Sequence, residues 1–144
     1  MLATLLSACQ FQPVQSDPGF EVEPGESGKQ IRPSSETSKA ALSLLAKART
    51  AAKEGQLDVA ESQLERALRI EPRNAVLWHY MAKLRLYQGR LDQAAGLAAK
   101  SNSLDRADHD LQANNWRIIA HARHQQGDLS GAKAAQQRVD DLSQ

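Results

Sequence analysis

The sequence predicts an all-α protein made of three stacked helical hairpins, a short α-solenoid. Gly55, Gly89 and Gly127 recur with the same neighbours, at spacings of 34 and 38 residues. An alanine lies seven residues before each glycine and another lies five residues after it, and these are Ala48, Ala82, Ala120, Ala60, Ala94 and Ala132. Such internal repetition is typical of stacked hairpins. Aromatic residues make up only 4% of the chain, which disfavours a β-sandwich or barrel.

Residues 1–9 end in the only cysteine of the chain, Cys9. The order Leu6, Ser7, Ala8 before it resembles the bacterial lipobox, in which a leucine and two small residues precede a cysteine that is acylated. The resemblance implies a signal remnant over residues 1–9, a covalent lipid on Cys9, a membrane anchor and no other cofactor. Several acyl chains on one residue give stable anchoring.

Two further features bear on this lipobox. By family analogy Gln10 favours the outer membrane, facing the periplasm, because an aspartate there tends to retain lipoproteins at the inner membrane. The stretch before Cys9 lacks the basic residues and the length of a complete signal peptide. Either the natural start lies upstream or the likeness is accidental.

Residues 10–37 contain four of the five prolines and show neither helical nor strand periodicity. We expect a disordered linker, because so little apolar surface cannot offset the entropy of ordering the chain. The linker carries a net charge of −3, so that the rest of the chain carries +4 of the total of +1. Four of its apolar residues, Phe11, Phe20, Val22 and Ile31, could contact the body or a partner.

Residues 38–144 resemble the tetratricopeptide repeat (TPR) family, whose 34-residue unit carries a fixed pattern of large and small residues. The repeats span about 41–74, 75–108 and 113–144. The positions that match the family pattern are Leu44, Ala48, Gly55, Ala60, Leu64, Ala67 and Pro72 in the first repeat, Trp78, Met81, Ala82, Gly89, Ala94 and Ala98 in the second, and Trp116, Ile119, Ala120, Gly127 and Ala132 in the third. The resemblance implies one TPR domain over residues 38–144.

Local signals within these repeats predict the helix ends. Glycine at each hairpin turn suits a left-handed helix cap, and Asn74 is a candidate N-cap for the second repeat. The interval between the second and third repeats is four residues longer than the interval between the first two, and the extra residues lie near Ser103–Asp110. They amount to about one helical turn, and we expect a longer second helix or a wider connection there.

The family resemblance also implies a partner-binding groove, because the first helix of each TPR hairpin lines a concave face. The groove residues that it implies are Val76, His79, Lys83, Tyr87, Asn114, Arg117, His121 and His124. The first repeat adds Leu42, Leu45, Arg49 and Lys53. This basic and aromatic strip suits a peptide or loop with acidic character, although a generic polar surface would have the same composition.

Catalytic motifs are not apparent, and we expect no enzyme activity. No phosphate loop, zinc-protease spacing or nucleophile elbow occurs. His121 and His124 lie three residues apart on a predicted helix, but two ligands alone make a weak metal site, so we expect none. The near-neutral charge does not indicate nucleic acid. Trp78 and Trp116 occupy repeat positions that indicate core residues rather than a stacking platform for sugars or bases.

An acylated cysteine, a tether and a short TPR stack together resemble LpoP-type lipoproteins, which activate bifunctional (class A) penicillin-binding proteins. The resemblance implies an outer-membrane lipoprotein whose TPR domain binds a periplasmic protein and regulates peptidoglycan synthesis. Three other functions fit the same layout: a pilotin or assembly scaffold for an envelope machine, a module that binds peptidoglycan itself, and, if the lipobox is accidental, a cytoplasmic co-chaperone.

Overall fold

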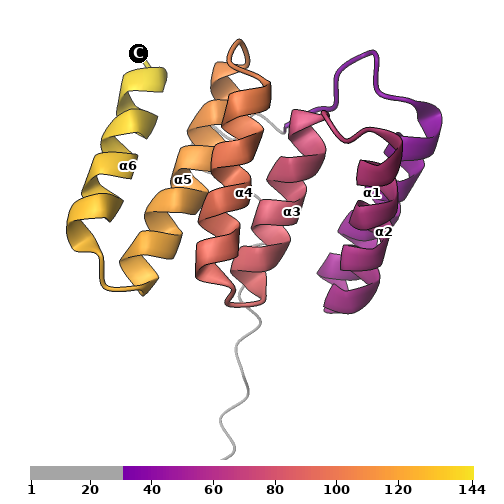
Figure 1. Ribbon diagram of the computed structural model, residues 1–144, viewed down its shortest axis with the longest axis horizontal. Helices are drawn as coiled ribbons and strands as arrows, with labels where there is room; N and C mark the ends of the chain where they lie inside the picture. The colour runs from indigo at the N-terminus through magenta and orange to yellow at the C-terminus, as the bar shows by residue number, and fades with distance from the viewer. Residues whose placement is uncertain (1–30) are drawn as a thin grey trace, which may run out of the picture.

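The computed structural model describes residues 31–144, so Cys9, the predicted lipobox and residues 10–30 of the predicted linker lie outside the described residues. The described part is all-α, as predicted, and forms three antiparallel hairpins that stand side by side (Figure 1). The helices are α1 (Lys39–Lys53), α2 (Leu57–Ile70), α3 (Ala75–Tyr87), α4 (Leu91–Leu104), α5 (His109–Gln125) and α6 (Leu129–Leu142). Within residues 31–144 no helix has the length and apolarity that crossing a membrane requires.

The three repeated glycines mark equivalent turns, one within each hairpin. Gly55, Gly89 and Gly127 have φ angles of 75°, 71° and 81°, a left-handed conformation that other residues adopt only with strain. The residue after each glycine donates its N–H to a carbonyl five residues back, as Gln56 does to Ala51 over 2.8 Å. This Schellman geometry satisfies carbonyls that the ending helix leaves unpaired. The prediction of a glycine cap is therefore confirmed.

The other expected helix signals divide into one confirmation and one correction. Asn74 caps α3, since its side-chain oxygen accepts hydrogen bonds from the N–H groups of Val76 and Leu77. The four extra residues of the third repeat do not lengthen α4, which has 14 residues like α2. They lengthen the following helix instead, because α5 has 17 residues and α3 has 13. Asp108 caps α5 one turn early by accepting from the Leu111 N–H, which starts the helix sooner and keeps the loop short.

Several alanines of the paired helices in the first two hairpins are buried. Ala82 of α3 and Ala94 and Ala98 of α4 are fully buried, and Ala48 of α1 and Ala60 of α2 are 1% exposed. A side chain of one carbon lets two helix backbones come together, and the gaps between hairpins are filled by larger residues. One buried cluster joins the first two hairpins and a second joins the last two. Leu64, Leu77, Leu84 and Leu111 are the largest apolar side chains that are almost completely buried.

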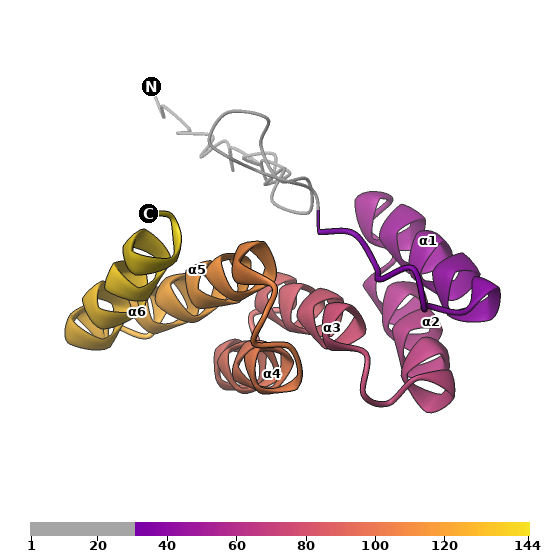
Figure 2. The ribbon, with the colours of Figure 1, turned by 90° about the horizontal axis from the view of Figure 1, so that it is seen from above.

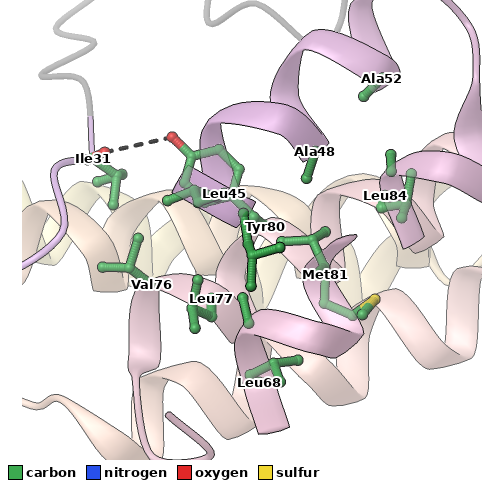
Figure 3. Close-up of a cluster of buried hydrophobic side chains, with 14 of the residues drawn as sticks. Ile31, Leu45, Ala48, Ala52, Leu68, Val76, Leu77, Tyr80, Met81 and Leu84 are labelled. Atoms are coloured by element: carbon green, nitrogen blue, oxygen red, sulfur yellow. Dashed lines mark hydrogen bonds between the residues drawn. The ribbon is translucent and has the colours of Figure 1, made fainter. Parts of the chain in front are cut away.

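The last part of the predicted linker packs onto the body. Ile31 is 6% exposed and lies among Leu45, Val76 and Tyr80 (Figure 3). The Tyr80 hydroxyl donates a hydrogen bond of 3.5 Å to the Ile31 carbonyl. Residues 31–37, which the sequence assigned to a disordered linker, therefore include a buried contact, because Ile31 is large and apolar and an apolar site on α3 lies within its reach.

Two polar contacts hold the chain just before α1. Glu71, in the loop between α2 and α3, accepts a hydrogen bond of 2.7 Å from the Ser38 N–H. The Asn74 side chain donates to the Thr37 hydroxyl over 3.1 Å and to Glu71 over 2.7 Å. The start of α1 is thus fastened to the connection between the first two hairpins.

A buried polar network joins the second and third hairpins. His79 Nδ1 lies 2.8 Å from the Asn115 side-chain oxygen, and the Asn115 amide nitrogen donates to Ser101 and Asn102, each over 2.8 Å. Ser101 in turn donates to the Ala75 carbonyl over 2.8 Å. His79, Ser101 and Asn115 are all buried, so each polar group depends on its neighbours for hydrogen bonds.

The packing predicts that Ala82→Leu lowers the free energy of unfolding by about 1–3 kcal/mol, because the added atoms meet a filled interface. Urea denaturation followed by circular dichroism measures the change. Ala99→Leu is the matched control, since Ala99 is exposed on α4 and should change stability by less than about 0.5 kcal/mol. Equal effects at both positions would contradict the proposed close contact.

The buried histidine predicts a pH dependence of stability. Burial, only partly offset by the bond to Asn115, lowers the pKa of His79 from 6.5 to about 4. Between these values the unfolded chain binds a proton that the folded chain excludes. The free energy of unfolding should therefore fall as pH drops from about 6.5 to 4, by roughly 3 kcal/mol from this group.

Urea denaturation at a series of pH values tests this dependence, and His79→Gln removes the titrating group. The slope between pH 6.5 and 4 should shrink in that variant. Glu61, whose pKa is lowered to about 2 by hydrogen bonds from Arg85 and Gln88, loses its contribution only below pH 4.5. An unchanged slope in His79→Gln would show that His79 is not the residue responsible.

Candidate partner-binding face

The hairpins form an arc, and the first helix of each one lines its inner side. Figure 2 shows α1, α3 and α5 on this side and α2 and α4 on the other. Residues 31–38 run along the inner side near α1 and α3. We call the surface of α1, α3 and α5 on this side the inner face, and it corresponds to the concave face that the sequence predicts as a groove.

A row of basic side chains crosses the inner face at one repeat position. Arg49, Lys83 and His121 each lie six residues before the glycine of their hairpin, on α1, α3 and α5. Residues at the same position of stacked repeats occupy equivalent places along the solenoid. We call these three residues the basic row. Arg49 and Lys83 are half-buried and His121 is exposed.

Arg49 and Lys83 of this row both lie beside the ring of Tyr80. The Arg49 guanidinium carbon is 5.6 Å from the centre of the Tyr80 ring, and the Lys83 ammonium is 5.8 Å from it. Both distances are within the range of a cation–π interaction. Burial, with a smaller contribution from the Arg49 charge, lowers the pKa of Lys83 to about 8. The two cations therefore disfavour one another.

Three of the predicted groove residues are not accessible to a partner. Val76 is buried beside Ile31, and His79 is 3% exposed and bonded to Asn115. Leu45 of the first repeat is buried as well. The expectation that these side chains face a ligand is wrong, because the family positions are filled here by α5 and by residues 31–37.

The remaining predicted residues are at least partly exposed. Lys83, Tyr87 and Asn114 are half-buried, and the Asn114 amide donates to the Asp110 carbonyl of its own helix over 2.8 Å. Arg117, His121 and His124 are exposed on α5. Residues 114, 117, 121 and 124 are spaced to share one side of a helix. The accessible candidate site therefore extends from Arg49 across Lys83 and Tyr87 to the exposed side of α5. Binding at these positions stays a prediction.

His121 and His124 are not arranged as a metal site with other ligands. The His121 Nε2 atom lies 2.6 Å from the side-chain nitrogen of Gln125. Over the described range 31–144, no three histidine, cysteine, aspartate or glutamate residues lie in a group that could hold a metal ion.

A separate hollow of about 810 Å³ opens between α2, α3 and α4, away from the inner face. Trp78 lines it and packs against the core of the first two hairpins. The indole N–H donates to the Pro72 carbonyl over 2.8 Å, and the Lys100 ammonium lies 3.5 Å from the centre of the ring. Both the polar edge and one face of this ring are already engaged within the chain.

Two residues of the inner face were missed as site residues by the sequence reasoning. Tyr80 was not assigned to the groove, although it directly follows His79 in α3. Ile31 was noted only as an apolar residue of the linker. In the sequence each of them is only a single large apolar residue. That they contact one another could be seen only once α1 and α3 were placed side by side.

Comparison with known proteins identifies the family. The sequence profile of the tetratricopeptide repeat matches residues 41–84, and no curated protein matches the chain significantly. The globular C-terminal domain of P. aeruginosa LpoP superposes with a TM-score of 0.70 at 37% identity, covering 72% of this chain and 97% of that one. The N-terminal domain of stress-induced protein-1 (STI-1) from C. elegans, with a TM-score of 0.64 and 19% identity, covers 77% of this chain and all of that one and shares the fold alone. The chain therefore belongs to the tetratricopeptide repeat family and is an LpoP-like protein.

Proposed function

We propose that this protein is a lipid-anchored activator whose inner face binds a class A penicillin-binding protein in the periplasm. The observation that carries the proposal is the 37% identity over 97% of the LpoP C-terminal domain. Identity of this degree over nearly a whole domain means that the two proteins share sequence as well as the helical fold. It is consistent with a protein-interaction module of the LpoP type.

The inner face supplies the chemistry for recognising a protein partner. Exposed Arg117 on α5 and the half-buried Arg49 and Lys83 of the basic row suit a partner surface with acidic side chains. Complementary charges of this kind mainly increase the rate of association and exclude wrong partners. Half-buried Tyr87 adds an amphipathic surface of the kind that interfaces favour.

Activation needs only a difference in affinity between two conformations of the synthase. If the TPR domain binds the active conformation more tightly, its binding increases the population of that conformation. The TPR domain then needs no catalytic group of its own.

The anchor completes the proposal. We assign Cys9 as the site of lipid attachment and the outer membrane as its location, on the resemblance of residues 6–9 to a lipobox and on Gln10. Residues 31–37 pack onto the body, so the 21 residues from 10 to 30 remain as the linker, and they would span about 65 Å if fully extended. That length gives the TPR domain a reach well away from the membrane surface.

The assay for the proposed function is glycan polymerisation by a purified class A synthase, with and without the full chain carrying Cys9→Ser. The chain should bind the synthase and raise its rate. Arg117→Glu should weaken binding by about tenfold, because it places a negative charge against an acidic partner.

Arg66→Glu is the matched control for this assay, because Arg66 is an exposed arginine on α2, away from the inner face. It should leave both binding and activation unchanged. Absence of binding together with an unchanged rate would remove the proposal. Sedimentation of the chain with isolated peptidoglycan instead would indicate a module that binds the polymer itself.

The anchor has its own test. Radiolabelled palmitate should be incorporated into the protein in its native host, and Cys9→Ser should abolish the label, because the chain has no other thiol to carry it. Cell fractionation should place the labelled protein in the outer membrane. Label retained by Cys9→Ser would show that acylation takes place elsewhere.

A further inference from the structure

The chain approaches the body directly beside the basic row. Ile31 is buried against α1 and α3, and its carbonyl accepts the hydrogen bond from Tyr80. Tyr80 is also the ring that Arg49 and Lys83 flank. Figure 3 shows Ile31 and Tyr80 joined at this point. Whatever precedes Ile31 in the sequence therefore starts within a short distance of both cations.

The charge of Arg49 is not neutralised by the described part of the chain. It lies over the Tyr80 ring and near the ammonium of Lys83, and no carboxylate among residues 31–144 forms an ion pair with it. Lys83 is half-buried, and its pKa is lowered by burial and by Arg49. A carboxylate beside the Tyr80 ring would stabilise the charge of Arg49.

The sequence before Ile31 supplies such carboxylates. Glu21, Glu23 and Glu26 lie within ten residues of Ile31, and Lys29 is the only basic residue between Glu21 and Ile31. Five residues span at most about 18 Å, and ten at most about 36 Å. Glu26 can thus reach the cations directly, and the other two can reach further along the inner face toward α5.

We propose that the acidic stretch of residues 21–26 occupies the inner face of its own TPR domain, with its carboxylates against Arg49 and Lys83. The contact of Ile31 with Tyr80 is the first part of this interaction, and the acidic stretch continues it. Because the stretch is joined to the body by only a few residues, its effective concentration at the cations is in the millimolar range. An acidic partner must displace it to bind there.

This interaction makes partner binding a competition within the molecule. If the acidic stretch covers the inner face in about nine molecules out of ten, the apparent affinity for a competing partner is about tenfold lower than the affinity for the uncovered face. The proposal concerns the same face as the proposed function but does not depend on the identity of the partner.

Paramagnetic relaxation enhancement in the full chain tests the proposal. The chain carries Cys9→Ser and Gly25→Cys with a nitroxide label on the new thiol, and amide signals of α1 and α3 are recorded. The label should broaden the signals around Arg49 and Lys83 well beyond the broadening in a variant with Glu21→Gln, Glu23→Gln and Glu26→Gln. These changes lie outside residues 31–144, which form the described TPR domain, so loss of the fold does not complicate the comparison.

Matched controls separate this contact from simple proximity of the label to Ile31. Glu36→Gln with Asp17→Asn removes two carboxylates outside the stretch and should leave the broadening unchanged. Arg49→Gln should reduce it, and so should 1 M salt, at which charges are screened beyond about 3 Å. Equal broadening in the parent and in the triple glutamine variant overturns the proposal.

Two further measurements distinguish the proposal from a contact with a second copy of the chain and from a failure of the proposed function. Broadening of an unlabelled molecule by a labelled one, in a mixture of the two, would assign the contact to a second copy and overturn the proposal. If the synthase binds, the triple glutamine variant should bind it roughly tenfold more tightly. If the synthase does not bind at all, the proposed function fails while the relaxation experiment still decides this proposal.

Discussion

The close approach of paired helices through alanine is the constraint on which the rest of the structure depends. Ala48, Ala82 and Ala94 are buried at the helix contacts, and the three glycine turns keep the helices of each hairpin antiparallel. Because every hairpin repeats the same contact, the hairpins stack with a small regular rotation and form an arc. The arc brings the first helices of the three hairpins onto one inner face. The basic row therefore depends on how the hairpins stack and not on a local sequence motif.

Between the second and third hairpins, hydrogen bonds take the place of part of the apolar packing. Asn115 bonds simultaneously to His79, Ser101 and Asn102, each at 2.8 Å. An apolar interface tolerates small rotations, whereas a buried polar network is stable only when every member keeps its partner. The network therefore fixes how the longer helix α5 sits against α3 and α4, at the boundary where the repeat spacing changes.

Much of the framework could be predicted from the sequence, because it depends on local and periodic signals. The turns at Gly55, Gly89 and Gly127 and the cap at Asn74 need only the residues around them. The place of the four extra residues was predicted wrongly, since Asp108 acts as a cap that starts α5 early and neither lengthens α4 nor widens the loop.

The candidate site was harder to predict than the framework. His79 and Val76 occupy positions that face ligand in the family, yet they are buried here by residues from α5 and from before α1. Those contacts join residues far apart in sequence, such as His79 with Asn115 and Ile31 with Tyr80. Helical periodicity reports which side of a helix a residue is on but not what covers that side.

The order of contacts at the start of the body determines how it responds to mechanical load. Ile31 comes before Thr37 and Ser38, and the latter two are fastened to Asn74 and Glu71. A pull from the N-terminal side strains the contact of Ile31 with Tyr80 first, because the fastening behind it bears no tension until that contact opens. Stretching the chain would thus uncover Val76 and Tyr80 on the inner face while α1 stays in place.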